Sequence, residues 1–229
     1  MHPVRHCYRI RPTKLKGVLR LHFFLLAQLV ISLPIYAQKV AKTEVLFDGK
    51  TLTGWKTLNP ADKDLWYVAD SLIKGGDGVR KIPANSYLYT LKEYGDFEFR
   101  CLFRLSGNPA TGMINSGIQY RSLVDGGKMV GYQADIGNGF WGDIYDEHRR
   151  GKLVGGDLSV LKRILKEDGW NSYIIRCKGN RHELYINGVK TCDYTEQDSQ
   201  VPQKGVIAVQ LHEGGMAQVE FRDLVIVEL

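Results

Sequence analysis

Short segments in which apolar and polar residues alternate, separated by Gly, Asn and Asp, recur along most of this 229-residue chain. Alternation with a period of two is typical of β-strands with one buried face. Many short strands joined by tight turns close as two packed sheets, so we expect one all-β domain over residues 38–229, a sandwich or jelly roll. The pattern predicts strands over 44–47, 65–69, 71–74, 86–90, 96–105, 113–121, 129–136, 172–178, 181–187, 189–194, 205–211 and 217–228.

Turn residues indicate how neighbouring strands pair. Asn187-Gly188 lies between two predicted strands, and Asn-Gly favours a type I′ hairpin. Gly179-Asn180 predicts a similar turn one strand earlier, so residues 172–194 should form a three-stranded meander, and residues 66–73 should form a hairpin. The alternation slips by one position near Asp223, which indicates a bulge. Only residues 157–166 have the apolar spacing of a short helix.

Residues 1–37 have the order of a secretory signal peptide. Residues 1–20 are basic, residues 21–33 are an apolar run, and the small residue Ala37 stands at the expected cleavage site. The run is shorter than the ~20 residues of a membrane-spanning helix. We therefore expect a periplasmic or extracellular protein that leaves the membrane after cleavage; the alternative is an uncleaved membrane anchor.

The same segment accounts for the positive charge. The chain has 31 Lys and Arg against 25 Asp and Glu, and six of these basic residues but no acidic ones lie in residues 1–37. The rest of the chain is balanced. A basic pI is the usual signature of nucleic-acid binding. Here the excess belongs to the export segment, so we expect no nucleic-acid partner.

Three cysteines follow residue 37, which allows at most one disulfide. Cys101 is in phase with Phe97, Phe99 and Phe103, so it is predicted to be a core residue. Pairing of Cys177 with Cys192 stays open, because spacing in the sequence does not bring their Cα atoms within bonding range. The sequence has neither a C-x-x-C motif nor a His–Cys cluster, so we expect no structural zinc site.

Polar residues at alternate positions recur on three predicted strands in the second half of the chain. Strand phase places Gln133 with Asp135 and Gln210 with His212 on one face each. On the strand over 113–121, one face carries Asn115, Gly117, Gln119 and Arg121. Three such faces side by side can line a binding cleft. The alternative is that they are ordinary solvent-facing residues.

Trp141 and the histidines are further candidates for a functional role. Trp141 is either a platform for a sugar ring or a core residue. Of the three histidines after residue 37, His182 follows a turn and is predicted to lie on the surface. His148 stands beside Glu147, where a carboxylate could raise its pKa. His212 remains as the histidine on a predicted polar face.

Several catalytic patterns are absent from the sequence. No G-x-S-x-G nucleophile elbow and no G-x-x-x-x-G-K phosphate loop occurs. Retaining glycosidases place two carboxylates about 5–5.5 Å apart. A sandwich can do this from a single strand, but here Asp135 stands alone on its strand. Two-carboxylate hydrolysis from one strand is therefore disfavoured.

An ordered series of short motifs resembles the 3-keto-disaccharide hydrolase domain family. It opens with Leu46-Phe-Asp-Gly-Lys-Thr-Leu-Thr-Gly-Trp55 and extends over about residues 44–229. The resemblance implies a concanavalin A-like (laminin-G-like) β-sandwich in an exported protein, and action on glycosides oxidised at C3. The other matching segments are 95–100, 115–118, 131–135, 170–171, 178–180, 187–188, 205–212 and 221–224.

The implied chemistry suits the residues at hand. A C3 ketone acidifies the C2 proton, whose removal gives an enolate that can expel the C1 substituent, after which water can add. This route needs a base, an acid and a donor near the ketone oxygen. We expect Asp135 or His212 as base, Glu147 as the other acid/base, and Arg121 or Arg149 as the enolate stabiliser; a divalent cation could replace the arginine. The expected substrate-binding residues are Asn115, Gln119, Gln133, Trp141, Tyr145 and Gln210.

Two other functions compete with this one. A non-catalytic, lectin-like carbohydrate-binding module would use the same polar residues without turnover. A conventional glycosidase would use carboxylates from separate strands, such as Asp135 and Glu147, and would cleave an unoxidised glycoside. Cleavage that requires the C3 ketone separates the first function from both.

Overall fold

A computed structural model describes residues 41–229 of the protein. The predicted signal peptide over residues 1–37 lies outside the described residues. The described residues belong to one compact unit. Within the described range, no helix is both long enough and apolar enough to cross a membrane.

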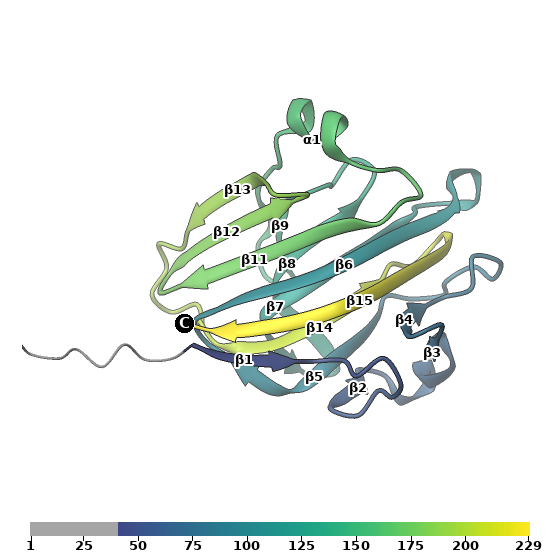
Figure 1. Ribbon diagram of the computed structural model, residues 1–229, viewed down its shortest axis with the longest axis horizontal. Coiled ribbons are helices and arrows are strands. Elements are labelled where there is room, and N and C mark those ends of the chain that lie inside the picture. The colour runs from purple at the N-terminus through teal and green to yellow at the C-terminus, as the bar shows by residue number, and fades with distance from the viewer. Residues whose placement is uncertain (1–40) are drawn as a thin grey trace, which may run out of the picture. The chain divides into compact units, whose positions relative to one another are not determined.

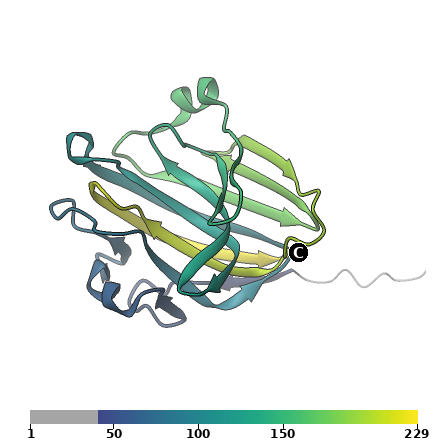
Figure 2. The ribbon, with the colours of Figure 1, turned by 180° about the vertical axis from the view of Figure 1, so that it is seen from behind.

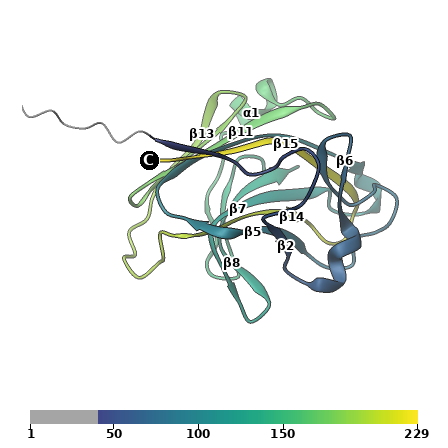
Figure 3. The same cartoon turned by 60° about the horizontal axis from the view of Figure 1, so that its bottom comes forward.

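Two antiparallel sheets pack face to face, as the alternating pattern predicts (Figures 1 and 3). In the first sheet, β1 pairs with β15 beside the path β13-β12-β11-β6-β15-β4-β3; the second sheet has the order β10-β9-β8-β7-β14-β5-β2. The first sheet consists of β1 (Lys42–Val45), β3 (Trp66–Ala69), β4 (Leu72–Gly75), β6 (Phe97–Asn108), β11 (Asn171–Lys178), β12 (Arg181–Ile186), β13 (Val189–Thr195) and β15 (Met216–Glu228). The second consists of β2 (Trp55–Thr57), β5 (Ser86–Tyr94), β7 (Asn115–Asp125), β8 (Lys128–Gly137), β9 (Ile144–Glu147), β10 (Gly151–Val154) and β14 (Gly205–Leu211).

The predicted turns are present. Asn187 and Gly188 both have positive φ in the β12–β13 hairpin, and β11–β12–β13 form the expected meander. Asp70 and Ser71 make the β3–β4 turn, with φ of 56° and 59°. The β15 register shifts between Arg222 and Val225, with Asp223 at φ 55°, which confirms the bulge.

Helical structure is confined to three short elements among the described residues. The predicted helix is α1 (Leu158–Ile164), and Asp157 caps it by accepting hydrogen bonds from the backbone N–H groups of Ser159 and Val160. Two 3-10 helices, Pro60–Leu65 and Pro109–Thr111, each begin after an Asn cap with Pro at the first turn. In Figure 1, α1 stands at one end of the sandwich, above β13.

The main core lies between the sheets. Phe99 and Phe103 of β6 are fully buried beside Cys101, and Ile118, Ile136 and Val209 are buried from the second sheet. Cys101, Cys177 and Cys192 are all buried free thiols, which answers the open pairing question. Because apolar residues of β7, β8 and β14 point inward, the residues between them point to the other face of that sheet.

Candidate active site

Strand register brings the predicted polar residues together on the outer face of the second sheet. Figure 2 shows the ribbon from the side of this sheet. Gln210 of β14 pairs with Gly117 of β7, and Gly117 pairs with Asp135 of β8. Gln133 lies two positions from Asp135 on the same face and pairs with Tyr145 of β9. The consecutive strands β7, β8 and β9 and the distant strand β14 therefore contribute to one site.

A pocket of about 160 Å³ opens on this face. Seven of its nine lining residues are predicted site residues, and the other two, Met113 and Phe140, add apolar walls. Its floor is buried although it faces away from the core. The lining residues are Met113, Asn115, Gln133, Asp135, Phe140, Tyr145, Glu147, Gln210 and His212.

A chain of side-chain hydrogen bonds leads to Asp135 from outside the pocket. Ser122 Oγ donates to Gln119 Oε1 at 2.8 Å, and Gln119 Nε2 donates to Gln133 Oε1 at 2.7 Å. Gln133 Nε2 then donates to Asp135 Oδ1 at 2.5 Å. Gly117 makes room for this chain, since a Cβ there would lie 2.5 Å from Gln133 Cδ. Gln119 itself is buried and supports Gln133 rather than lining the pocket.

Asp135 and Glu147 have perturbed protonation in this pocket. Burial raises the pKa of Asp135 to about 8; the hydrogen bond from Gln133 opposes the rise, and the charges of Asp143 and Glu147 add to it. Burial also raises the pKa of Glu147, opposed by His148 and the hydroxyl of Tyr87. Buried carboxyl groups with shifted pKa values in one pocket mark a candidate acid/base site.

Three further polar side chains are arranged to bind a ligand. His212 Nδ1 lies 2.8 Å from the backbone oxygen of Glu213, which can only accept, so Nδ1 is the donor there and the neutral tautomer of this ring presents Nε2 as an acceptor. The amide of Asn115 makes no hydrogen bond within the described part of the chain. Gln210 Nε2 donates to the Tyr87 hydroxyl at 3.2 Å, while Gln210 Oε1 is buried with no partner among residues 41–229. A buried acceptor of this kind suits a ligand hydroxyl.

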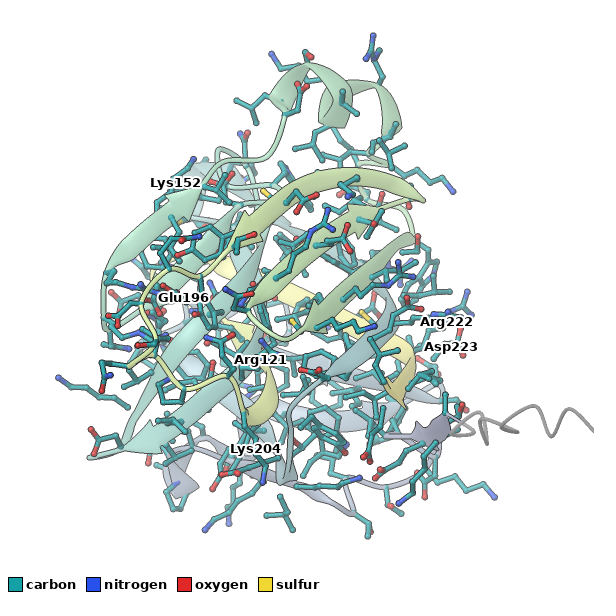
Figure 4. All side chains as sticks on the ribbon, turned by 90° about the vertical axis from the view of Figure 1, so that its left-hand side faces the viewer. Arg121, Lys152, Glu196, Lys204, Arg222 and Asp223 are labelled. Carbon is teal, nitrogen blue, oxygen red and sulfur yellow. The ribbon has the colours of Figure 1, made fainter. Side chains whose placement is uncertain are left out.

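Arg121 does not lie at this site, contrary to the prediction from strand phase. The β7–β8 register shifts between Tyr120 and Leu123, and Arg121 takes a φ of 47°, which turns its side chain inward. Its guanidinium is fully buried (Figure 4) and bonds to the backbone oxygens of Gly95 and Gly179. Arg121 therefore holds the turns at one end of the sandwich together.

Arg149 also lies outside the pocket. It pairs with the buried carboxylate of Asp146, with Nε at 2.9 and 2.8 Å from the two oxygens. Asp146 alternates with the pocket residues Tyr145 and Glu147, so it points to the opposite face of β9. Arg150 bridges Asp146 to Glu196 in the same network. Neither predicted arginine is thus placed to stabilise an enolate in the pocket.

Two aromatic or histidine predictions are also corrected. Trp141 packs against the main core, with its ring 6.2 Å from that of Phe103, so the core interpretation holds over the sugar platform. His182 is fully buried rather than on the surface. Its ring lies 4.4 Å from that of Tyr132, and burial lowers its pKa to about 4. His148 bonds to the backbone oxygen of Met129 and does not line the pocket.

Met113, Phe140 and Tyr87 belong to the site but were not predicted from the sequence. Tyr87 lies opposite Gln210 in the β5–β14 register, and pairing between two strands so far apart along the chain has no signal in the sequence. Phe140 follows Gly139 in a tight turn after β8. Among residues 41–229, no group of three or more His, Cys, Asp or Glu side chains is arranged to hold a metal ion.

Solved structures with a similar fold include proteins that act on or bind carbohydrate. A candidate glycosyl hydrolase of Parabacteroides distasonis ATCC 8503 is 22% identical with a TM-score of 0.61, covering 82% of this chain and 100% of that one. The carbohydrate-binding module CBM66 of Bacillus subtilis is 15% identical with a TM-score of 0.55, covering 75% and 93%. The VIP36 exoplasmic/lumenal domain, bound to Ca²⁺ and Man3GlcNAc, is 10% identical with a TM-score of 0.57, covering 82% and 89%. These likenesses confirm the concanavalin A-like sandwich.

The fold and its polar pocket define a carbohydrate-active β-sandwich protein. A family model described as the 3-keto-alpha-glucoside-1,2-lyase-like domain matches residues 42–227. The chain belongs to this family, which confirms the resemblance found in the sequence motifs. Comparison with curated protein sequences gives no match.

Proposed function

We propose that the protein cleaves 3-keto-glycosides by removing the C2 proton and eliminating the C1 substituent, with the outer-face pocket as active site. The observation that carries this proposal is that the carboxyl groups of Asp135 and Glu147 line one pocket among amide side chains. Burial raises the pKa of both carboxyl groups. Family membership supplies the substrate class, and the pocket supplies the acid and the base.

The two carboxyl groups divide the work. Because its pKa is about 8, Asp135 is protonated at neutral pH and can give its proton to the departing glycosidic oxygen. Glu147 is the less buried of the two and is assigned as the ionised base that takes the C2 proton. The electron pair of the C2–H bond forms the C1–C2 double bond as the C1–O bond breaks. The products are an unsaturated 3-keto sugar and the free alcohol.

The remaining pocket groups bind and orient the sugar. The free amide of Asn115 is assigned to the ketone oxygen, where it can donate to the developing enolate. The unpartnered Gln210 Oε1 and the acceptor Nε2 of His212 are assigned to sugar hydroxyls. Addition of water to the unsaturated product would complete a net hydrolysis, so lyase and hydrolase activities share the first step.

The first test is turnover of a chromogenic 3-keto-glucoside beside the unoxidised glucoside. Release of the chromogenic alcohol from the keto form alone supports the proposal. An unsaturated sugar product lighter by one water than 3-keto-glucose identifies the lyase reaction. Asp135→Asn and Glu147→Gln should each lower kcat by about 10²–10⁴-fold, the usual contribution of one acid or base. The matched control is Asp64→Asn, an exposed carboxyl outside the pocket, which should leave kcat unchanged. A chelator in parallel assays tests the divalent cation.

Release from the unoxidised glucoside as well would contradict the elimination route and favour a conventional glycosidase that uses Asp135 and Glu147. A carbohydrate-binding module is the second candidate, because the fold is shared with CBM66 and with the sugar-bound VIP36 domain. Sugar binding without turnover of either glucoside would favour it.

We also propose that the protein is exported, with cleavage after Ala37. The support is the order of basic segment, apolar run and small residue in the sequence. N-terminal sequencing of the protein recovered from the periplasm or medium tests this proposal. A first residue at Gln38 is expected, and recovery of the full-length chain in the membrane fraction would contradict it.

A further inference from the structure

The outer face of the second sheet carries a second hollow, called the apolar hollow here because six of its nine lining residues are aliphatic or aromatic. This apolar hollow has a volume of about 540 Å³. Three of the large apolar side chains that the described residues expose lie in it: Leu91 at 65%, Leu123 at 36% and Val124 at 45% exposure. Its lining residues are Tyr89, Leu91, Glu93, Ser122, Leu123, Val124, Asp125, Val130 and Val206.

A small apolar cluster joins the hollow to the active-site pocket. Tyr87, Met129, Val206 and Ala208 are buried together, apart from the main core, with Tyr89 packed against them. Tyr87 bonds to Gln210 of the pocket, whereas Tyr89 and Val206 line the hollow. The two sites are thus adjacent parts of one surface.

Strand β14 shows the same change from polar to apolar along its outer face. Along β14, the polar Gln210 is followed on the same face by Ala208 and then by Val206. The four residue steps from Gln210 to Val206 span about 14 Å at the rise of an extended strand. That length accommodates a sugar in the pocket with an attached ring or chain lying in the hollow.

We propose that the apolar hollow is the binding site for the aglycone, and that the substrates are 3-keto-glycosides of apolar, uncharged alcohols or phenols. This inference rests on the proposed function. Its basis is the continuity of the hollow with the sugar pocket and the exposure of side chains that only an apolar ligand would cover favourably. Glu93 and Asp125 at the hollow disfavour an anionic aglycone.

The test compares the 4-methylphenyl and 4-hexylphenyl 3-keto-glucosides, in both anomers. Their leaving groups have nearly the same acidity and differ in apolar length, so a difference in KM reports contact with the aglycone. We expect kcat/KM at least about tenfold higher for the hexyl compound, since burial of even part of the longer chain suffices for this. The double variant Leu123→Ser/Val124→Ser should bring the ratio of the two substrates close to one.

The matched control is Leu158→Ser, an exposed leucine at 50% on α1 and outside the hollow, which should keep the preference. Turnover of both substrates with equal kcat/KM would overturn the aglycone site alone. Turnover of neither would overturn the proposed function; binding of the two unoxidised glucosides, measured by calorimetry, then decides the subsite separately. A dimer that Leu123→Ser/Val124→Ser dissociates would assign the surface to a second copy of the chain and overturn the proposal.

Discussion

Gln133 donates a hydrogen bond of 2.5 Å from Nε2 to Oδ1 of Asp135. The direction of that bond is set by Ser122, which begins the series of hydrogen bonds through Gln119 and Gln133. Because Gln119 Oε1 accepts from Ser122, Gln119 presents its NH₂ group to Gln133, whose own NH₂ group must then face Asp135. Asp135 Oδ1 is therefore always an acceptor. The acidic proton resides on Oδ2, which accepts no hydrogen bond from the described residues.

Reversing this chain should change the acidity of Asp135. In Gln119→Glu, the new carboxylate cannot donate, so Gln133 is expected to turn its NH₂ group toward position 119 and its carbonyl toward Asp135. Loss of a donor to the ionised form should raise the pKa of Asp135 by about one unit. The high-pH limb of kcat/KM for the 3-keto substrate should move up accordingly.

An uncharged variant separates this effect from that of the added charge. Gln119→Met also lacks the donor, so it should move the same limb upward by a smaller amount. If the pH profile of both variants matched that of the parent protein, Gln119 would be a packing residue with no influence on Asp135.

The protonation of Asp135 also predicts how stability depends on pH. Its pKa rises from 3.8 to about 8 on folding, so the folded state retains a proton that the unfolded state releases in this range. The free-energy cost of ionising Asp135 in the folded protein is absent below pH 3.8, grows between pH 3.8 and about 8, and is complete above about pH 8. Asp135→Asn removes the ionisation and should be relatively more stable at pH 9 than at pH 5, by on the order of a few kcal/mol.

Denaturant unfolding of the two proteins at both pH values measures this difference. An equal difference in unfolding free energy at pH 5 and pH 9 would mean that Asp135 has an ordinary pKa in the folded protein. The assignment of Asp135 as the proton donor would then fail with it.

The sequence predicted much of the fold because its information is local. Each of the twelve predicted strands overlaps a strand of the structure, and the turns at Asn187 and Asp70 follow from residues that tolerate positive φ. The short strands β2, β9 and β10 were not predicted. In β9 each face carries a polar residue: Glu147 lines the pocket beside Tyr145, and Asp146 is buried in an ion-pair network on the face of Ile144. Alternation carries no signal in such a strand.

The site was predicted where register follows strand phase, and the prediction failed where phase breaks. Gln133, Asp135 and Gln210 share a face because each strand is regular up to that point. Arg121 leaves this face at a bulge that no residue in the sequence predicts. His182 was placed on the surface because it follows a turn, whereas its environment comes from tyrosines of other strands.

His182 should make the protein sensitive to mild acid. Burial lowers its pKa from 6.5 to about 4, so the unfolded state binds a proton that the folded state refuses between these values. Stability is therefore lost as pH falls from 6.5 toward 4. His182→Phe preserves an aromatic ring beside Tyr132 and cannot be protonated, and Gln203 Oε1 keeps its bond from Arg121.

Melting temperatures at pH 7.5 and 4.5 test this expectation. The drop between the two should be smaller in His182→Phe than in the parent protein, corresponding to on the order of 2 kcal/mol less lost stability. An unchanged drop would show that acid sensitivity comes from other groups.

Arg121 should matter for stability rather than for chemistry. Its buried guanidinium donates to the backbone oxygens of Gly95 and Gly179 and pairs with Asp96 at 2.9 Å. Arg121→Met leaves these acceptors without their donor, and removing one partner of a buried charged network costs about 3–5 kcal/mol. Chemical denaturation should show this loss, whereas Arg163→Met, an exposed arginine on α1, should change the unfolding free energy by less than ~0.5 kcal/mol.

Kinetics complete the comparison for Arg121→Met. At a temperature where the variant is fully folded, kcat and KM for the 3-keto substrate should equal those of the parent protein, because the guanidinium lies on the far side of the sheet from the pocket. A variant that kept its unfolding free energy but lost kcat would return Arg121 to the reaction as an enolate stabiliser. The Asn115 amide would then no longer suffice as the donor to the ketone oxygen.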